Sequence, residues 1–166
     1  MEAWSPGLIE AEPDFFRGDS WQLLLREPRF CLRAAMFMRA RLRGADYRWD
    51  TRVAIGLGGV ARVNKKRTSL STGEAFTLSG RALDTMGAAS NMVVAAGPGA
   101  PADGLAPLSA LCSVLIDDWS SRQAEVAALA LVPSPLTQAE IAERIGISQQ
   151  AVSKALASAR VPALLQ

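Results

Sequence analysis

The chain has 166 residues, of which 49% are hydrophobic and 20% are charged, a composition typical of a globular protein with one medium or two small domains. It contains no histidine, which excludes Ser-His-Asp triads, Cys-His pairs and the usual zinc sites. No apolar run is long enough to span a membrane, and the N-terminus lacks a secretory pattern, so we expect a cytoplasmic protein with no membrane partner.

The net charge of +2 is divided unevenly along the chain. Residues 1–90 carry 14 Lys and Arg against 10 Asp and Glu, whereas residues 91–166 carry 4 against 6. The front is therefore basic and the back slightly acidic. If the basic face of the front part, with the loop "NKKR" at 64–67, shares one surface with the C-terminal stretch, the uneven charge is explained.

The front of the sequence predicts a small sheet with helices packed on it. "FFRGDSWQLLL" has apolar runs on both sides of a Gly-Asp pair, which is typical of a β-hairpin. Apolar residues at helical spacing predict a helix over 28–43, and the stripe at 30–42 indicates either core or a dimer seam. The remaining expected elements are a buried strand at 51–60, a polar loop at 62–73, a helix at 71–86 capped by Ser71 or Thr72, and a strand at 91–96.

A segment rich in Ala, Pro and Gly, "AAGPGAPADGLAP", separates this part from a helical one. It reads as a linker, so we expect domains at 1–94 and 108–166, joined by residues 95–107. The back part predicts two helices over 107–132, interrupted by "PSP" at 133–135, and then a final helical stretch.

The final stretch, "LTQAEIAERIGISQQAVSKALASAR", has an informative spacing. Gln138 is followed four residues later by Ala142 and eight residues later by Gly146. A small Ala lets a second helix cross closely, and Gly can adopt the left-handed conformation that ends a helix. Thr137 and Ser148 are suited to cap the two helices. This pattern resembles the helix-turn-helix of bacterial transcription regulators.

The resemblance implies that residues 149–160 form the helix that enters the major groove of duplex DNA. Gln149, Gln150, Ser153 and Lys154 would then face base edges and phosphates, while Thr137, Gln138, Arg144 and Ser148 would complete the interface. The alternative is a packed helix pair that serves dimerisation or docking, which the acidic balance of the back part favours. Few cations in one chain indicate a homodimer.

Three segments of the front resemble class III nucleotide cyclases and the related GGDEF domains: the Gly-Asp hairpin, "RVAIGLGGV" and "GEAFTLSGRALD". Their order, followed by the helix-turn-helix, resembles the SatD-type family, in which a cyclase-like domain precedes such a motif. The resemblance implies an α+β fold with a truncated ferredoxin-like, cyclase-like α/β sandwich and an all-α C-terminal domain. It places Asp19 as a metal aspartate and Arg81 as the arginine that stabilises the pentavalent phosphorus.

This chain also departs from the cyclase pattern. Thr77 stands where cyclases keep the Asn that orients the ribose, and Phe15 replaces a base-selecting Lys. The strand with the first metal ligand would lie upstream of residue 1, so we expect a non-catalytic domain without a cofactor. Alternatively, Asp19 accepts backbone N–H groups in its turn and Arg81 pairs with Asp84 or Asp19.

These observations together predict a DNA-binding transcriptional regulator whose front domain serves dimerisation or sensing. The alternatives left open are a nucleotide- or metal-binding sensor with a small-molecule ligand, and a protein-interaction module that binds no DNA. The arginine-rich segment at 39–52, with Tyr47 and Trp49, indicates a solvated helix end or a second nucleic-acid contact.

Overall fold

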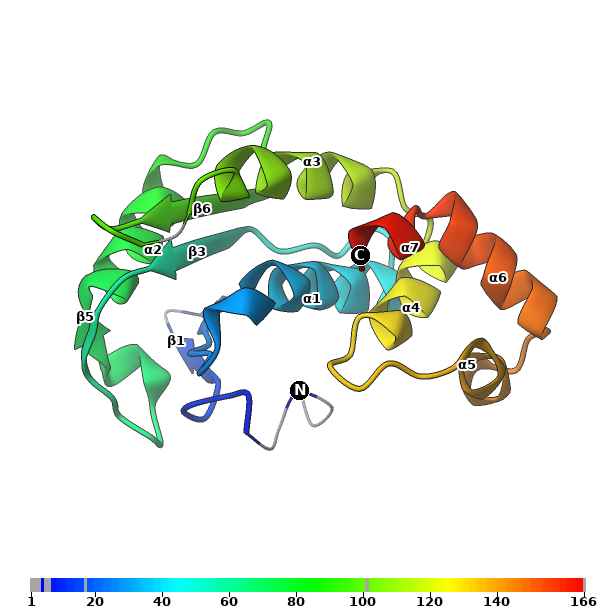
Figure 1. Ribbon diagram of the computed structural model, residues 1–166, viewed down its shortest axis with the longest axis horizontal. Helices are drawn as coiled ribbons and strands as arrows, with labels where there is room; N and C mark the ends of the chain where they lie inside the picture. The colour runs from blue at the N-terminus through cyan, green and yellow to red at the C-terminus, as the bar shows by residue number, and fades with distance from the viewer. Residues whose placement is uncertain (1–3, 5–6, 17, 101, 166) are drawn as a thin grey trace.

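The computed structural model describes residues 4, 7–16, 18–100 and 102–165 and has a mixed α/β fold (Figure 1). The strands and helix α2 (Glu74–Thr85) lie toward one end of the long axis, and helices α5 (Gln138–Ile145) and α6 (Gln149–Ser158) lie at the other. Helix α1 (Cys31–Ala45) runs through the middle between them. One end of the molecule is therefore built from strands and α2, and the other from the C-terminal helices.

The predicted hairpin is confirmed. Strands β1 (Asp14–Phe16) and β2 (Ser20–Gln22) pair antiparallel, with Phe16 opposite Ser20. Gly18 in the turn has a φ of 87°, a value that favours glycine over other residues. The hairpin is held from outside by the 3₁₀ turn Thr68–Leu70, where the Ser69 hydroxyl and backbone N–H both donate to the Asp14 carboxylate.

A parallel strand pair with a crossover helix forms the second unit. Strands β3 (Val53–Leu57) and β6 (Met92–Ala96) pair in parallel, with Val53 opposite Met92, and α2 connects them across one face. A side chain at Gly56 would place its Cβ 2.0 Å from the Ala75 carbonyl oxygen. Only glycine allows α2 to approach β3 this closely.

Two details of this unit differ from the sequence-based predictions. The N-cap of α2 is Gly73, with a φ of 145°, and neither Ser71 nor Thr72 caps it. Thr72 instead lies in the short strand β5 (Thr72–Gly73), which pairs antiparallel with β4 (Val60–Arg62) where a polar loop was expected. Thr72 is thus engaged in the strand pairing, and the Ser71 hydroxyl accepts a hydrogen bond from the Asn64 N–H instead.

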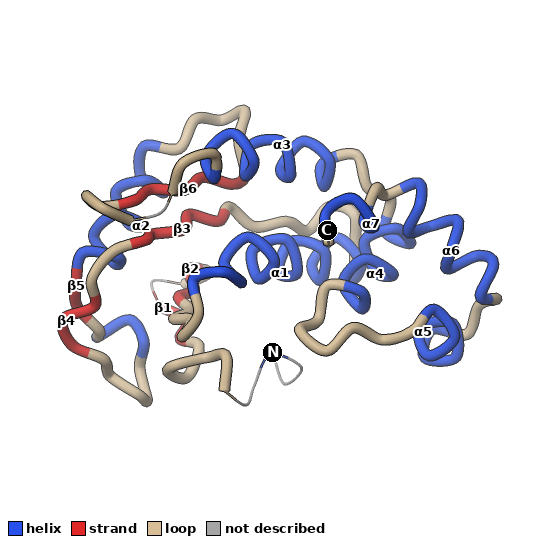
Figure 2. The backbone as a smooth tube through the Cα atoms, viewed as in Figure 1, coloured by secondary structure: helices blue, strands red, loops and turns tan. Residues whose placement is uncertain are grey.

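The strands form three separate two-stranded sheets within the described residues: β1–β2, β3–β6 and β4–β5 (Figure 2). The hairpin thus lies in a different sheet from the parallel pair. The coarse α+β class is confirmed, while a single ferredoxin-like sheet is not formed by these pairings.

Helix α1 is the centre of the core. It follows a 3₁₀ turn that begins at Pro28, and its small and apolar side chains are buried as expected for core: Ala34, Ala35, Met36, Phe37 and Ala40. Helices α3 (Leu105–Asp117) and α4 (Ser121–Ala130) both pack against it, and α3 also packs on β6. The buried residues on both sides of the predicted linker therefore belong to one hydrophobic cluster.

Two arginines of α1, the buried Arg39 and the partly buried Arg33, join the elements around it. Arg39 is fully buried and donates to the carboxylates of Asp50 and Asp117 and to the Ser113 hydroxyl. Arg33 donates to the carbonyl oxygens of residues 130–132 at the end of α4, at 2.9 Å for Leu131. These contacts satisfy carbonyl groups that a helix end leaves without partners.

The hydrophobic core lies between α1, the parallel strand pair and the C-terminal helices.

Among the described helices, none is both long enough and apolar enough to cross a lipid bilayer. Both cysteines are free thiols, and burial raises the pKa of each.

Candidate nucleic-acid interface

The first helix of the C-terminal pair, α5, begins with a reciprocal cap. The Thr137 hydroxyl accepts a hydrogen bond from the backbone N–H of Glu140 at 3.2 Å, and the Glu140 carboxylate accepts one from the Thr137 N–H at 2.7 Å. The backbone and hydroxyl donors of Thr137 lower the pKa of Glu140 below its ordinary value. The Thr-x-x-Glu spacing that produces this capping box is readable in the sequence.

The turn between the two helices matches the predicted geometry. Gly146 ends α5 with φ 69° and ψ 39°, in the left-handed region. The N–H of Ile147 then donates to the Ala142 carbonyl at 3.0 Å, and the Ser148 hydroxyl caps α6 by accepting from the Ala151 N–H at 3.2 Å. The chain therefore turns sharply between α5 and α6, and Gln149 and Gln150 at the start of α6 are exposed.

The inner faces of the pair are apolar and buried. Ile141 and Val152 are 1% and 0% exposed, and Ala142 is buried where α6 packs against α5. Helix α4 packs against α6 as well, which makes a three-helix unit. The Trp119 indole N–H, at the start of α4, donates to the Ala159 carbonyl at the end of α6.

All eight predicted interface residues lie on the surface of this unit: Thr137, Gln138, Arg144, Ser148, Gln149, Gln150, Ser153 and Lys154. Four of them come together. Gln138, Gln149, Gln150 and Ser153 line a shallow hollow of about 300 Å³ between α5 and the first turns of α6. The hydroxyls of Thr137 and Ser148 accept the N-cap hydrogen bonds of α5 and α6. Their structural role is therefore to stabilise the starts of these helices.

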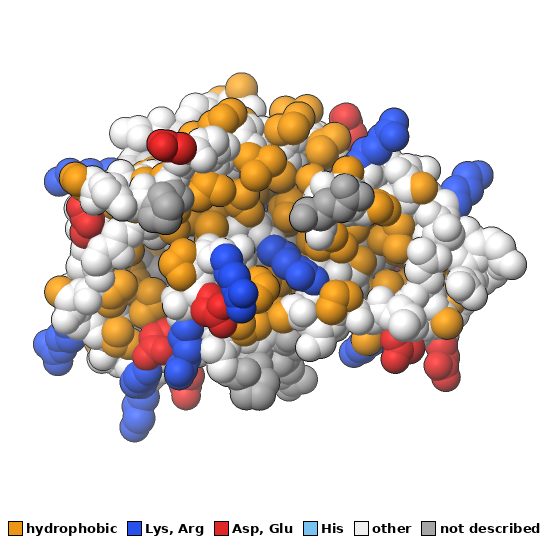
Figure 3. All heavy atoms as spheres, viewed as in Figure 1, with side chains coloured by type: hydrophobic (Ala, Val, Ile, Leu, Met, Phe, Trp, Pro, Cys, Tyr) orange, Lys and Arg blue, Asp and Glu red, His pale blue; other side chains and the backbone are white. Residues whose placement is uncertain are grey.

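The surface at this end carries few charged side chains. Arg144, Lys154 and Arg160 are exposed and form no ion pair within the described part of the chain, while Glu140 and Glu143 are exposed on α5. Figure 3 shows this end as largely uncharged polar surface, with basic side chains along one edge and acidic ones along the other. The hollow itself is lined by neutral hydrogen-bonding groups.

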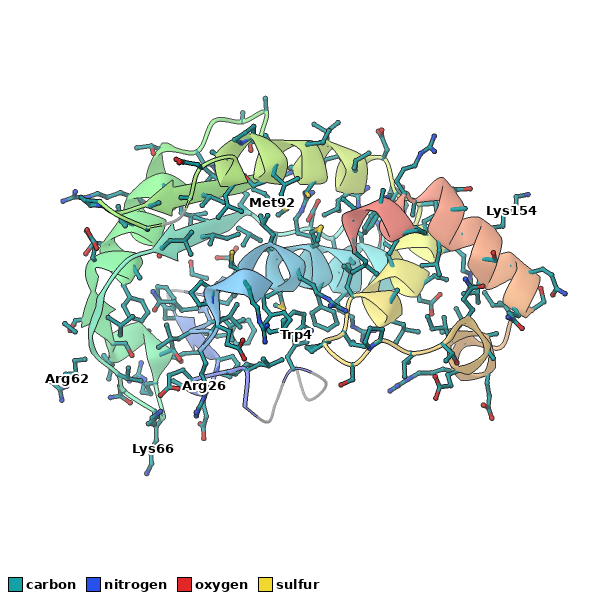
Figure 4. All side chains as sticks on the ribbon, in the orientation of Figure 1. Trp4, Arg26, Arg62, Lys66, Met92 and Lys154 are labelled. Atoms are coloured by element: carbon teal, nitrogen blue, oxygen red, sulfur yellow. The ribbon has the colours of Figure 1, made fainter. Side chains whose placement is uncertain are left out.

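The basic loop does not share this surface. Figure 4 shows Arg62 and Lys66 at the opposite end of the long axis from Lys154. Two cations of that loop are also paired locally, because Lys65 bonds to Glu10 and Arg67 lies 3.7 Å from Asp14. The basic loop and the α5–α6 pair therefore do not form one basic patch on a single chain.

The arginine-rich segment at 39–52 is also less available than its composition indicates. Arg39 is fully buried, and Arg43 bonds to Asp50 and to the carbonyl oxygens of Asp117 and Trp119. Tyr47 and Trp49 are 66% and 58% exposed. The sequence pattern did not distinguish arginines that hold α3 and α4 in place from arginines that face solvent.

The second set of predicted residues comes from two separate elements. Asp19 lies at the hairpin tip, and Thr77 and Arg81 lie on α2; all three are exposed. Thr77 donates to the Gly73 carbonyl at 3.3 Å. Within the described ranges, no hydrogen bond or ion pair joins Asp19 to Arg81, or Arg81 to Asp84.

A carboxylate occupies the place where such α/β units bind phosphate. Phosphate groups bind at the carboxyl ends of parallel strands, against the N-terminus of the following helix. Here Glu74 begins α2 at that point, and its carboxylate accepts from the Gly59 N–H at 3.2 Å. It lies so close to Gly58 and Gly97 that a Cβ on either would be 2.5–2.8 Å from its oxygens. A bound phosphate would meet this negative charge.

No cluster of three or more His, Cys, Asp or Glu side chains that could hold a metal ion occurs in residues 4, 7–16, 18–100 and 102–165.

Comparisons with protein-family models, with curated proteins and with solved structures find no match for this chain. The geometry of the α5–α6 surface is therefore the basis for assigning a function.

Proposed function

We propose that this protein binds duplex DNA through α5 and α6 and acts as a transcriptional regulator. The observation that supports it is the convergence of Gln138, Gln149, Gln150 and Ser153 on one exposed hollow at the end of the molecule. Helix α6 enters the major groove with its first turn, where amide side chains can pair with adenine edges. The N-terminus of α5 and Arg144 flank the phosphate backbone.

The shape of the molecule is consistent with this use. The α5–α6 pair forms one end of the long axis, so a duplex can approach it without meeting the strands at the other end (Figure 1). The helix pair also has the αL turn and two side-chain caps that fix the angle between its helices. A docking surface for another protein would more commonly present exposed apolar anchors, and none line this hollow.

We assign the front part a non-catalytic, cyclase-like role and relate the chain to the SatD-type family. The observed order of hairpin, helix, strand, helix and strand supports this relation. The position of the Glu74 carboxylate at Gly58 and Gly59 argues against phosphate binding, and so against the alternative of a nucleotide sensor. We further propose that the protein is cytoplasmic, where it would meet DNA.

The test is selection of a binding sequence from pooled random duplexes, followed by gel shifts with variants. Gln149→Ala and Gln150→Ala should each weaken binding to the selected site by about 5- to 150-fold, the range for loss of one bidentate base contact. Ser158→Ala, at the exposed far end of α6, is the matched control and should bind normally. Circular dichroism confirms that each variant is folded.

Two results would contradict the proposal. The first is that no sequence is enriched from the pool. The second is that the selected duplex binds Gln149→Ala, Gln150→Ala and Ser158→Ala equally well, which would place the contact elsewhere. If addition of a nucleotide with magnesium raises the melting temperature instead, the sensor alternative is favoured.

A further inference from the structure

Helix α3 carries an apolar face that no part of the described chain covers. Residues 104–116 contain no charged side chain. Leu108, Leu111 and Val114 are 44%, 57% and 58% exposed, although the opposite face of the helix packs on β6 and α1. Three large exposed hydrophobic side chains in succession on one helix are unusual for a surface that meets only water.

An apolar groove runs beside this face. It has a volume of about 590 Å³ and lies between the start of α1, helix α3 and the C-terminal helix α7 (Val161–Leu164). Leu105 and Leu108 form one wall, and Phe30 and Leu164 form the other. In Figure 3, hydrophobic side chains gather over α3 and the adjoining region near the start of α1. The face and the groove thus adjoin at Leu108 and form a largely apolar surface, with Arg29 and Arg33 also lining the groove.

We propose that a second copy of this chain covers the surface, with the two α3 helices packed antiparallel about a two-fold axis near Leu111. In that arrangement Leu108 of one copy faces Val114 of the other. An isologous contact requires the same patch to be complementary to itself. A helix that is uncharged over its whole exposed stripe meets this requirement, since no like charges face each other at the axis.

Arg29 at one end of the stripe and Asp118 at the other carry opposite charges, and Asp103 is also exposed just before α3. Asp118 follows Leu111 by seven residues, so it continues the same helical face, and it forms no ion pair within the described chain. Arg29 lines the groove near Leu105, at the other end of α3. Antiparallel packing brings Asp118 of each copy beside Arg29 of the other, where the exposed Arg29–Glu27 pair leaves the guanidinium accessible.

This inference rests in part on the proposed function. A helix-turn-helix with Arg144, Lys154 and Arg160 as its cations neutralises few phosphates, and two copies double that number. The dimer surface lies on α3 and at the start of α1, so it leaves the α5–α6 end free in both copies. The dimer therefore has a role in DNA binding without using the reading residues.

The experiment is sedimentation equilibrium on the full chain, with Leu111→Asp as the test variant. Leu70→Asp is the control, because Leu70 is 52% exposed and lies on the 3₁₀ turn beside the hairpin. We expect a dimer for the wild type and for Leu70→Asp. Leu111→Asp should raise the dissociation constant at least about tenfold, since it places two like charges at the axis. Unchanged melting temperatures would show that both variants fold.

A charge exchange gives an independent test of orientation. Arg29→Asp and Asp118→Arg should each weaken the dimer, and the double variant should restore it. Wild-type chains that stay monomeric at high micromolar concentration would overturn the proposal, as would equal effects of Leu111→Asp and Leu70→Asp. Uptake of an apolar ligand by a monomer would assign the groove to that ligand instead. A stable dimer that selects no DNA sequence would refute the proposed function and leave this inference standing.

Discussion

The indole N–H of Trp119 donates a 3.0 Å hydrogen bond to the backbone carbonyl of Ala159, and so joins the start of α4 to the end of α6. Trp119 is 4% exposed and Ala159 is 1% exposed, so water does not replace this bond if it is lost. The bond satisfies a carbonyl at a helix end and fixes α6 against the rest of the molecule.

We expect Trp119→Phe to lower the free energy of unfolding by about 1–3 kcal/mol, because a buried acceptor loses its donor. Urea denaturation measures the loss. The control is Trp49→Phe, at an indole that is 58% exposed, and its change should stay within about 0.5 kcal/mol. Equal losses at the two tryptophans would mean that the hydrogen bond contributes nothing.

Gly56 and Gly80 should respond oppositely to alanine. At Gly56 the new Cβ would lie 2.0 Å from the Ala75 carbonyl oxygen, so α2 would have to move off β3, at a cost of about 3 kcal/mol. Gly80 lies on the exposed side of α2 with open space around it, and alanine there should stabilise the helix by about 0.5–1 kcal/mol. Thermal unfolding of both variants checks the signs. A tolerated Gly56→Ala would contradict the close packing of α2 on β3.

The pair of Asp50 and Arg39 predicts a stability that depends on pH. Burial alone would raise the pKa of Asp50, but the hydrogen bonds and charge of Arg39 outweigh it and lower that pKa below its ordinary value. Because the folded-state pKa is the lower one, the stabilisation is complete above the unfolded pKa of about 3.9 and is lost as the pH falls through the folded value.

Asp50→Asn should therefore destabilise the protein by about 1–3 kcal/mol at pH 7. The difference between the wild type and the variant should stay constant from pH 7 to about pH 5 and shrink below about pH 4. Urea denaturation at several pH values measures this. A difference that grows toward low pH would show that the carboxylate is not stabilised by Arg39.

Two lysines at opposite ends of the molecule test the orientation on DNA. Lys154 lies on α6 and Lys66 lies at the far end of the long axis (Figure 4). If the proposed interface is right, Lys154→Ala should lower the slope of log affinity against log salt by about one unit, whereas Lys66→Ala should leave it unchanged. Fluorescence anisotropy with the selected duplex at several salt concentrations gives both slopes. A change for Lys66→Ala alone would place the DNA at the other end.

The C-terminal helix pair could be predicted closely from the sequence, because its signals are local. Gly146, Thr137 and Ser148 act on backbone groups within four residues of themselves, so their spacing predicts their geometry. The same is true of the hairpin around Gly18, whose pairing is between neighbours in the chain. The four glutamine and serine residues of the hollow follow from helical periodicity once the turn is known.

The rest depends on contacts between distant residues. Ser71 and Thr72 are good N-cap residues, yet the pairing of Thr72 with Arg62 moves the start of α2 to Gly73. Arg39 lies in an arginine-rich segment that reads as surface, but Asp50 and Asp117 allow it to be buried. The separation of the basic loop from α6 is likewise a property of the whole fold, and net charge by segment carries no information on it.

The three carbonyl groups that Arg33 binds at the end of α4 have a consequence for the spacing of half-sites on DNA, if the protein binds DNA as proposed. They tie the helical unit that carries α6 to α1, and α1 packs against α3. In a dimer built on α3, the span between the two recognition helices is thus set by packed helices and not by a tether. Such a dimer should bind only operators with one fixed distance between the half-sites. A change of half a helical turn in that distance should abolish binding, even when the sequence of each half-site is optimal.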